Sequence, residues 1–330
     1  MTDRNKRVHV AVGVIINPRG EVLIAKRASK QHLGGLWEFP GGKLEADEDV
    51  RQALARELHE ELGIIVTHQT PLCIIRHNYP DKAVLLDVWT VHGFTGQPHG
   101  REGQPLRWVK PGELAYNDFP EANRAIIRAI RLPGYMALID LPSPLIPGDF
   151  DHPDQLPDNT LIRLRRTTMP TETEDKKYVS SVRAFLDAGI LAGHPIVVDI
   201  NANPALQKDL AQALHSHSRF LGYFANRHTL RKLTERPEGD QVLLGCACHS
   251  DEELMQAAAL SADFATVSPV LPTSSHPDQP GMGWDVLSGL ADRHRIPVYA
   301  MGGLSLADLT TARAAGARGI AGISMFKRKK

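Results

Sequence analysis

The stretch GGKLEADEDVRQALARELHEELGI, from Gly41 to Ile64, contains seven acidic residues and the strongest helical pattern in the chain. This pattern predicts a helix from Asp47 to Leu62 that ends at Gly63, because glycine is common directly after a helix. Three leucines would form its buried stripe: Leu54, Leu58 and Leu62. Three glutamates would share the adjacent face: Glu57, Glu60 and Glu61.

So many carboxylates on one helix face need a positive counterpart. Like charges four residues apart disfavour a helix by roughly 0.2–0.5 kcal/mol per pair. Arg56 can offset one of these charges but cannot neutralise three. Oxygen ligands that converge from one helix suit Mg²⁺ or Mn²⁺, which also bind substrate phosphates. A solvated charged face is the alternative interpretation.

The spacing of residues around this helix follows a known pattern. Gly42 is followed by five residues, Glu48, seven residues, and then Arg56-Glu57-Leu58-x-Glu60-Glu61-x-Gly63-Ile64. This arrangement resembles the Nudix box of nucleoside diphosphate hydrolases at every defined position, and a match of this length is highly specific. The resemblance implies an α+β Nudix fold for the N-terminal part of the chain.

The resemblance also implies a role for each matching residue. The three glutamates would hold divalent metal ions, with Mg²⁺ expected and Mn²⁺ as the alternative, and the backbone at Gly41 would add a ligand. Glu48 and Arg56 would orient the loop and the carboxylates. The metal would neutralise the diphosphate and activate an attacking water. Glu57 would be a ligand, the general base, or both.

Three further stretches make the chain similar to the MutT-type 8-oxo-dGTP diphosphatases over residues 6–130: AKR before LWEFPGG, then GREGQPLRW, then NDFPEAN. This similarity implies that Glu102 is an additional metal ligand, the alternative being an ordinary exposed glutamate. Arg27 and Asn123 match positions that read the purine, although Asn123 could instead cap a helix. Phe39 and Phe119 would line the base pocket or belong to the core.

The reaction implied is metal-dependent hydrolysis of a purine nucleoside triphosphate, with 8-oxo-dGTP converted to 8-oxo-dGMP and pyrophosphate. This activity would remove a mutagenic precursor from the nucleotide pool. The box itself specifies only diphosphate chemistry, so dinucleotides and damaged pyrimidine nucleotides stay open as substrates.

Composition limits the partners and the location. The 330 residues include 38 Lys and Arg against 38 Asp and Glu, which argues against broad binding of nucleic acid or of an anionic membrane. No apolar run is long enough to span a bilayer, and no signal peptide precedes the first expected strand. The three cysteines form no disulfide framework, so a reducing cytoplasm is the expected location.

A second domain is expected after the sequence RLPGY, which begins at Arg131. The predicted domains are residues 1–131 and 132–330. In the first, a hairpin is expected over residues 8–27, strands over 72–76, 83–94 and 106–109, and a helix over 121–130. In the second, short apolar runs alternate with helical patterns, which indicates parallel strands and an α/β (β/α)₈ TIM-barrel-like fold.

The second half resembles the thiamine phosphate synthase and TenI family. The resemblance rests on CACHSDEELMQAAALSADFATVSPVLPT, IPVYAMGGL and AGARGIAGIS, in that order. It implies a phosphate site at the C-terminal ends of two strands, although glycines also occur there for conformational reasons alone. The residues concerned are Gly302, Gly303, Gly322 and Ser324.

Departures from that family argue against ordinary thiamine phosphate synthesis. Ala202 and Ala225 stand where acidic metal ligands are expected, His276 replaces a basic residue, and Arg165 alone remains of a Gln-x-Arg-x-Lys pattern. Three hypotheses stay open for the barrel: an inactive relative, a second enzyme of thiamine metabolism, or a phosphate-ligand sensor or dimerisation module. Scattered histidines match no standard metal site: His215, His217, His249 and His276. Cys246 and Cys248 are expected to be packing residues.

Overall fold

The computed structural model forms two compact units, Met1–Arg131 and Leu132–Lys330. The residues it describes are 7–29, 33–141, 156–168, 171–189, 191–214, 216–237, 242–273 and 280–326. Within these ranges no helix is long and apolar enough to cross a membrane. Each unit has its own sheet system and its own core.

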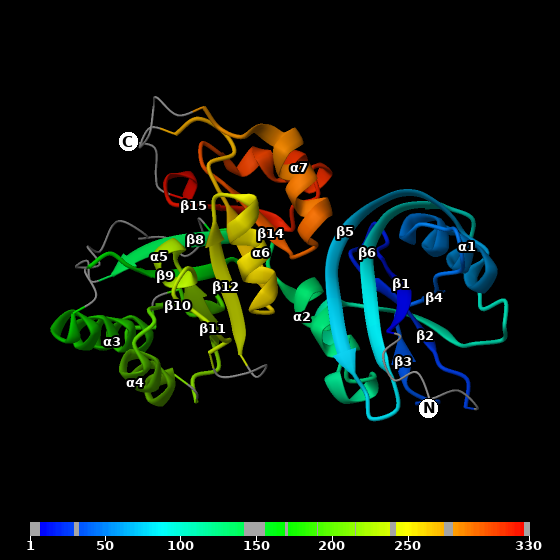
Figure 1. Cartoon of the computed structure of the whole chain (residues 1–330), viewed down its shortest axis with the longest axis horizontal. Coiled ribbons are helices and arrows are strands. Elements are labelled where there is room, and N and C mark those ends of the chain that lie inside the picture. Colours follow the sequence, from blue (N-terminus) through cyan, green and yellow to red (C-terminus); the bar gives the residue numbers. More distant parts are fainter. Residues whose placement is uncertain are drawn as a thin grey trace. The chain divides into compact units, whose positions relative to one another are not determined.

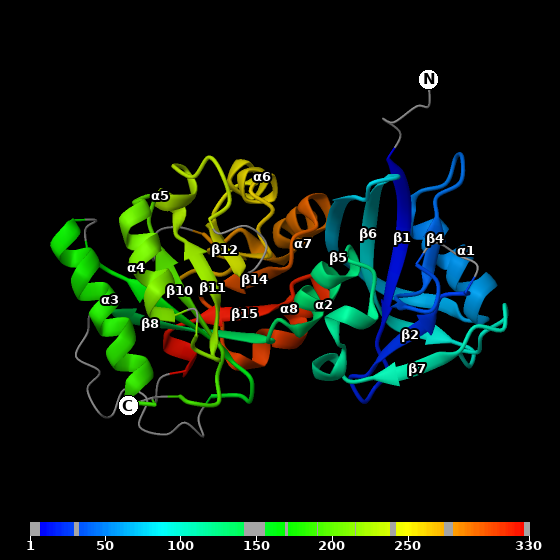
Figure 2. The ribbon, with the colours of Figure 1, turned by 90° about the horizontal axis from the view of Figure 1, so that it is seen from below.

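The first unit contains two small sheets (Figures 1 and 2). One has the order β4-β1-β6-β5, with bounds Gly41–Lys43, Val8–Ile15, Ala83–Thr95 and Ile65–Asn78. In Figure 2, β1 lies between β4 and β6, pairing antiparallel with β4 and parallel with β6. The other sheet has the order β3-β2-β7, with bounds Trp37–Glu38, Val22–Lys26 and Leu106–Val109.

The hairpin predicted over residues 8–27 is wrong in its pairing. The turn itself forms, since Gly20 donates its N–H to the carbonyl of Asn17 at 2.9 Å. However, β1 and β2 join different sheets, and only one isolated bridge, from Ile16 to Val22, links them. A short turn between two apolar runs therefore did not reveal which partners the strands take.

Helix α1 (Val50–Leu62) carries the acidic face and begins three residues later than the sequence predicted. Asp49 is the N-cap, and its carboxylate accepts the N–H groups of Arg51 and Gln52. The Gln52 side chain accepts a hydrogen bond from the backbone N–H of Asp49, which completes a capping box. Gly63 ends the helix in the left-handed conformation, as predicted.

The remaining helical segments of this unit are short. They are η1 (Pro111–Glu113), η2 (Tyr116–Asp118) and α2 (Asn123–Arg131). Helix α2 buries Ile126, Ile127 and Ile130 in the same core cluster as Phe39 and Phe119. The leucines of α1 are fully buried in a different cluster, around Trp89. The core thus holds α1 on one group of strand residues and α2 on another.

The second unit is a closed barrel of eight parallel strands, as the sequence predicted. The strands are β8 (Tyr135–Leu141), β9 (Leu161–Arg166), β10 (Ile196–Ile200), β11 (Phe220–Ala225), β12 (Leu243–Cys248), β13 (Phe264–Val267), β14 (Val298–Met301) and β15 (Gly319–Gly322). The helical segments are α3 (Glu172–Asp187), α4 (Pro204–Leu214), α5 (Arg227–Leu230), α6 (Asp251–Ala259), α7 (Gly283–His294), η4 (Leu306–Asp308), α8 (Leu309–Ala314) and η5 (Ser324–Phe326).

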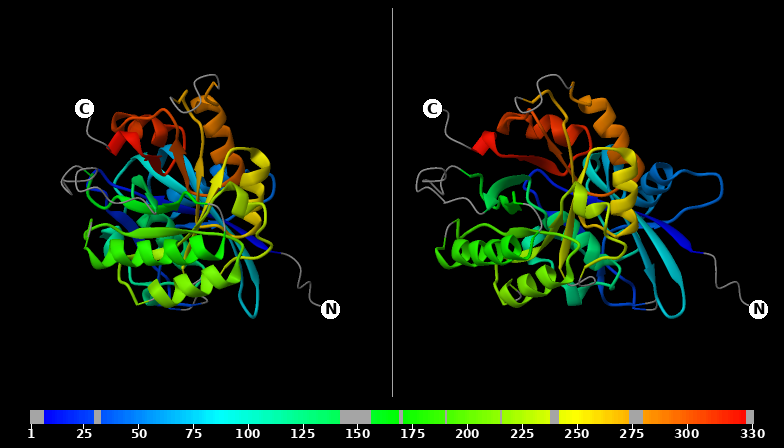
Figure 3. Two further views of the ribbon diagram at one scale, coloured as in Figure 1. Left: turned by 90° about the vertical axis from the view of Figure 1, so that its left-hand side faces the viewer. Right: turned by 60° about the vertical axis from the view of Figure 1, so that its left-hand side comes forward.

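Alternate strand residues of the barrel belong to two separate clusters, as expected for strands with two buried faces. One cluster includes residues of the helices and therefore lies between strands and helices. The other contains Phe224, Phe264 and Tyr299, whose rings lie close together, and no helix residue, so it fills the barrel interior. Figure 3 shows α3 and α4, both green, side by side on the outside.

Candidate active site

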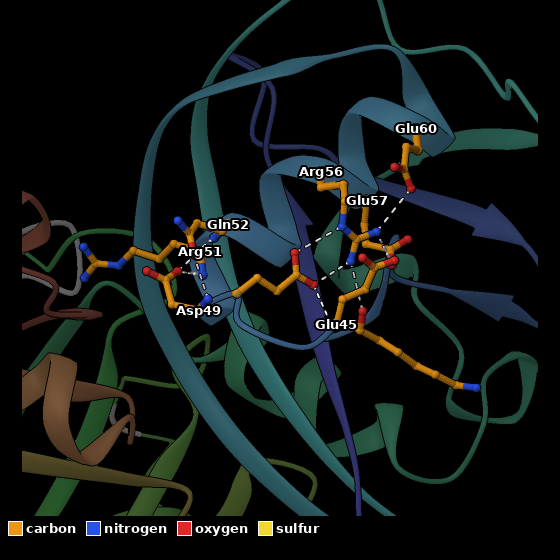
Figure 4. A network of polar contacts seen from close by, with 9 residues as sticks. Glu45, Asp49, Arg51, Gln52, Arg56, Glu57 and Glu60 are labelled. Carbon is orange, nitrogen blue, oxygen red and sulfur yellow. Dashed lines mark hydrogen bonds and ion pairs between the residues drawn. The ribbon is translucent and has the colours of Figure 1, made fainter.

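Arg56 joins the acidic residues of the α1 face (Figure 4). Its Nε and Nη2 atoms donate to the two carboxylate oxygens of Glu48 at 3.1 and 2.7 Å. Its Nη1 atom donates to Glu57 at 2.9 Å and to Glu60 at 3.2 Å. Nη2 also reaches the carbonyl oxygen of Lys43 at 3.1 Å, which ties the helix to β4. The pKa of Glu48 is lowered chiefly by its hydrogen bond from Arg56.

Two glycines of β4 make room for this arrangement. A Cβ atom at Gly42 would lie 2.1 Å from the carboxyl carbon of Glu57, so only glycine leaves Glu57 where it is. Gly41 has φ +143°, and a Cβ atom there would lie 2.1 Å from the carbonyl oxygen of Ala11 in β1. The two glycines are therefore needed for different reasons, one for the site and one for the sheet.

Glu61 lies apart from the Arg56 network. Its carboxylate accepts the backbone N–H of Gly41 at 3.2 Å. Burial raises the pKa of Glu61 to about 8, and the negative charges of Glu38, Glu57 and Glu102 add to the rise, while the Gly41 hydrogen bond lowers it. Three carboxylates therefore act on the partly buried Glu61, which is an electrostatic cost unless a cation is bound.

The donor set fits a hard divalent cation. Carboxylates and a nearby strand backbone are the oxygen ligands that Mg²⁺ and Mn²⁺ prefer. In the described part of the chain, no three Asp, Glu, His or Cys side chains converge as a formed metal site. Arg56 instead engages Glu57 and Glu60, so these carboxylates would have to turn toward a cation. Residue chemistry thus supports metal binding here, on carboxylates that Arg56 contacts in this structure.

The loop before β7 is fastened to the C-terminal end of α1. Arg101 donates its N–H to the carbonyl of Glu61 at 2.9 Å, and the Gln104 side chain donates to the same oxygen at 3.0 Å. Gln104 also accepts the N–H of Glu102 at 2.9 Å. Glu102 is exposed, and these contacts hold its backbone near Glu61.

The residues expected to bind the purine base make contacts separate from the Arg56 network. Arg27 forms an ion pair with Glu38, and both side chains are largely buried. The Phe39 and Phe119 rings stack with centroids 5.5 Å apart, and both residues are at most 4% exposed. Because so little of either ring reaches solvent, both pack as core residues in this structure. Asn123 is the first residue of α2 and is partly buried.

Two residues of this region were not predicted from the sequence. Glu38 pairs with Arg27 and acts electrostatically on Glu61. Tyr79 accepts the N–H of Ala122, next to Asn123, through its hydroxyl at 3.3 Å. An acid between Trp37 and Phe39 in LWEFPGG was a signal for the first, since acids are uncommon between buried aromatics. No local pattern pointed to Tyr79.

In the barrel, the expected phosphate-binding residues lie where the strands end. Gly302 and Gly303 directly follow β14 and have φ of +100° and +70°, respectively. Gly322 ends β15, and Ser324 begins η5. Ala225 ends β11 and is fully buried, and Ala202 is in the loop after β10. The structure thus brings these glycines to the C-terminal ends of neighbouring strands β14 and β15.

The interior of the barrel carries a buried ion pair, which lies against the ring of Phe224. Arg163 donates to both carboxylate oxygens of Asp199 at 2.7 and 3.0 Å, and both residues are at most 4% exposed. Arg165 makes a similar two-point contact with Asp140 at 2.5 and 2.8 Å. Arg165, the residue that matches the Gln-x-Arg-x-Lys pattern of the synthase family, is therefore hydrogen-bonded to a carboxylate of this chain.

The remaining polar candidates in the barrel do not form a site. His217 and His249 make local backbone contacts, and neither belongs to a metal-binding group among the described residues. His215 and His276 lie outside the described residues. Cys246 and Cys248 are fully buried in the cluster between strands and helices, as expected for packing residues.

Comparison with known proteins agrees with this arrangement. The NUDIX domain model matches residues 11–129, and the thiamine monophosphate synthase model matches residues 207–326. The 8-oxo-dGTP diphosphatase of Escherichia coli (strain K12) is 39% identical over 126 residues, covering 38% of this chain and 98% of that protein. The 8-oxo-dGTP diphosphatase of Proteus vulgaris is 50% identical over 86 residues, covering 26% and 77%, respectively.

Another relative has a different named substrate. The CTP pyrophosphohydrolase of Escherichia coli (strain K12) is 37% identical over 118 residues, covering 36% of this chain and 87% of that protein. The NUDIX model falls in the first unit, and the synthase model falls in the second. The chain therefore belongs to the Nudix hydrolases, as a pyrophosphohydrolase of the MutT group that carries a thiamine monophosphate synthase-type domain.

Proposed function

We propose that residues 1–131 form a Nudix domain that hydrolyses 8-oxo-dGTP to 8-oxo-dGMP and pyrophosphate, with Mg²⁺ as the cofactor and Mn²⁺ as a substitute. The observation that carries the proposal is the acidic end of α1, where Glu57 and Glu61 lie against the glycines of β4. Relatives named as 8-oxo-dGTP diphosphatases support the choice of substrate. The cytoplasm, where nucleotides are pooled, is the proposed location.

The residues divide the work in this proposal. Glu57, Glu60, Glu61 and the exposed Glu102 would hold the metal, which neutralises the diphosphate and lowers the pKa of water when bound. Arg56 and Glu48 would keep the carboxylates in place through the contacts described above. Glu57 is the proposed acceptor of a proton from the attacking water, because its carboxylate lies beside the glycines of β4.

Base selection would come from Arg27 and Asn123. An amide can donate and accept in one plane, which matches the edge of an oxidised purine. Asn123 is at the start of α2, and Phe39 and Phe119 pack in the same core cluster as that helix. The buried rings would then support the pocket from beneath. They do not offer open stacking faces.

For residues 132–330 we propose a barrel that is not a conventional thiamine phosphate synthase. Supporting this, Ala202 after β10 and Ala225 at the end of β11 supply no metal ligand. Gly302, Gly303, Gly322 and Ser324 would bind the phosphate of a small molecule, as a sensor or within a dimerisation module.

The test is the initial rate of hydrolysis of 8-oxo-dGTP, dGTP and CTP by the whole chain with Mg²⁺, following monophosphate and pyrophosphate. A strong preference for 8-oxo-dGTP is expected. EDTA should abolish hydrolysis of all three nucleotides. Glu57→Gln should fold normally and lose at least about 10²-fold in kcat. Asn123→Ala should chiefly erode the preference for the oxidised base. A preference for CTP or equal rates on all three would overturn the substrate assignment.

A further inference from the structure

Glu38 lies in β3, and Arg27 directly follows β2. Strands β2 and β3 pair antiparallel, with Ala25 opposite Glu38 and Lys26 opposite Trp37. Beyond the strands, Arg27 donates its N–H to the carbonyl of Leu36 at 2.9 Å. The Lys26 ammonium lies 5.7 Å from the centre of the Trp37 ring. The backbones that carry Arg27 and Glu38 are therefore fixed relative to each other.

This pairing places the two charged side chains on one face of the hairpin. Glu38 is opposite Ala25, and Arg27 follows Ala25 by two residues, so the charged pair is a diagonal cross-strand pair. The Arg27 Nη1 atom donates to the Glu38 carboxylate. Only 20% of the Arg27 side chain and 27% of the Glu38 side chain are exposed. A pair this buried is screened less by solvent than a surface pair.

Glu38 also acts electrostatically on Glu61 of α1. Its charge contributes to the raised pKa of Glu61, ahead of the contributions of Glu57 and Glu102. The residue after Glu38 is Phe39, which stacks on Phe119 beside α2. Glu38 is thus paired with Arg27, and the next residue in the chain belongs to the core cluster in which α2 packs.

We infer that Glu38 is a positioning residue that holds the Arg27 guanidinium in the orientation needed to select the purine base. This inference rests on the proposed function and adds a determinant of specificity to it. A guanidinium is a planar group with donors in a fixed fork, so an ion pair to a carboxylate on the neighbouring strand restricts where its remaining donors can point. Without Glu38, the Arg27 side chain would lose this ion pair and the restraint that it places on the guanidinium.

The experiment compares Glu38→Ala, Glu38→Gln and Glu113→Ala with the unchanged full-length chain, using kcat/KM for 8-oxo-dGTP and for dGTP. Glu38→Ala should lower the ratio of the two values by about tenfold, the scale of one hydrogen bond to a charged group. Glu38→Gln keeps an acceptor for Arg27 and should retain most of the ratio. Glu113 is exposed on η1, and its replacement should change nothing.

Two further measurements separate positioning from other roles. In a double-mutant cycle with Arg27→Ala, the effect of Glu38→Ala on the ratio should vanish. The Mg²⁺ concentration for half-maximal rate should stay within about threefold of the unchanged chain. Additive effects, equal loss on both substrates, or a larger shift in the Mg²⁺ requirement would overturn the inference. If the unchanged chain shows no preference for 8-oxo-dGTP, the proposed substrate is wrong. That outcome is distinct from a failure of the proposed role of Glu38, which requires a preference in the unchanged chain.

Discussion

Arg56 donates two hydrogen bonds to Glu48, from Nε and Nη2 to the two carboxylate oxygens at 3.1 and 2.7 Å. A lysine cannot reproduce a two-point contact and also reach Glu57. We predict that Arg56→Lys lowers kcat by about 10–100-fold with little change in melting temperature. Steady-state kinetics and thermal unfolding measure both. Arg19→Lys, at an exposed turn, is the control, and full activity of Arg56→Lys would contradict the role of this network.

Gly41 and Gly42 should respond differently to the same substitution. In Gly42→Ala the new methyl group meets the end of the flexible Glu57 side chain, so the protein should fold while kcat falls about as far as in Glu57→Gln. In Gly41→Ala the methyl group meets the backbone of β1, and the positive φ adds strain. That variant should lose about 1–3 kcal/mol of unfolding free energy. Urea unfolding and kinetics on both variants test the contrast, which equal stability would contradict.

Tyr79 offers a substitution that removes a single oxygen atom. Its hydroxyl accepts the N–H of Ala122, a buried residue, while its ring meets His77 edge-on with centroids 4.4 Å apart. In Tyr79→Phe the ring stays and the N–H loses its acceptor, which costs about 1 kcal/mol. Because Asn123 is the next residue, we expect KM for 8-oxo-dGTP to rise about fivefold while kcat stays constant. An unchanged KM would separate Tyr79 from substrate binding.

The comparison of sequence with structure shows which features are local. The α1 helix, its leucine stripe and its stop at Gly63 depend on neighbours within a few residues, and all were predictable. The predicted start at Asp47 was three residues too early. The capping box of Asp49 and Gln52 makes Asp49 the N-cap, so the helix begins at Val50. The eight-strand barrel followed from the alternation of apolar runs and helical patterns.

Features that depend on distant pairing were not predictable in this way. The β1–β2 turn reads as a hairpin, yet β1 pairs with β4 and β6, which only the folded sheets reveal. Glu38 was overlooked because its partner Arg27 is eleven positions away, across a loop. The interior pair of Arg163 with Asp199 joins β9 to β10, and no local sequence pattern links these two residues.

The buried cysteines of the barrel should be unreactive in the folded protein. Burial raises the pKa of Cys248 to about 12 and raises that of Cys246 further. Because the thiolate is the nucleophile and both pKa values lie far above 8, less than about 0.1% is ionised at pH 8. A thiol reagent should therefore label neither residue at pH 8 until urea is added, as peptide mass spectrometry would show. Rapid labelling of Cys248 in the native protein would contradict this burial.

The interior ion pair of the barrel should be more costly to break than to replace. Arg163 and Asp199 are at most 4% exposed, so Arg163→Met leaves a buried carboxylate without its partner. We predict a loss of about 3–5 kcal/mol in the unfolding free energy of the barrel, and recovery of most of it in Arg163→Met with Asp199→Leu. Hydrogen exchange of β9 and β10 peptides in increasing urea measures the barrel separately from the Nudix domain.

A surface pair provides the matched control for this prediction. Lys176 and Glu172 on α3 lie 2.7 Å apart, and their side chains are 68% and 81% exposed. Lys176→Met removes a charge from an ion pair in the same way but should cost less than about 0.5 kcal/mol, because solvent replaces the lost contact. If both single substitutions cost the same, burial does not determine the strength of these pairs. If the double variant is as unstable as Arg163→Met, the loss would come from packing, and the unpaired charge would not be its cause.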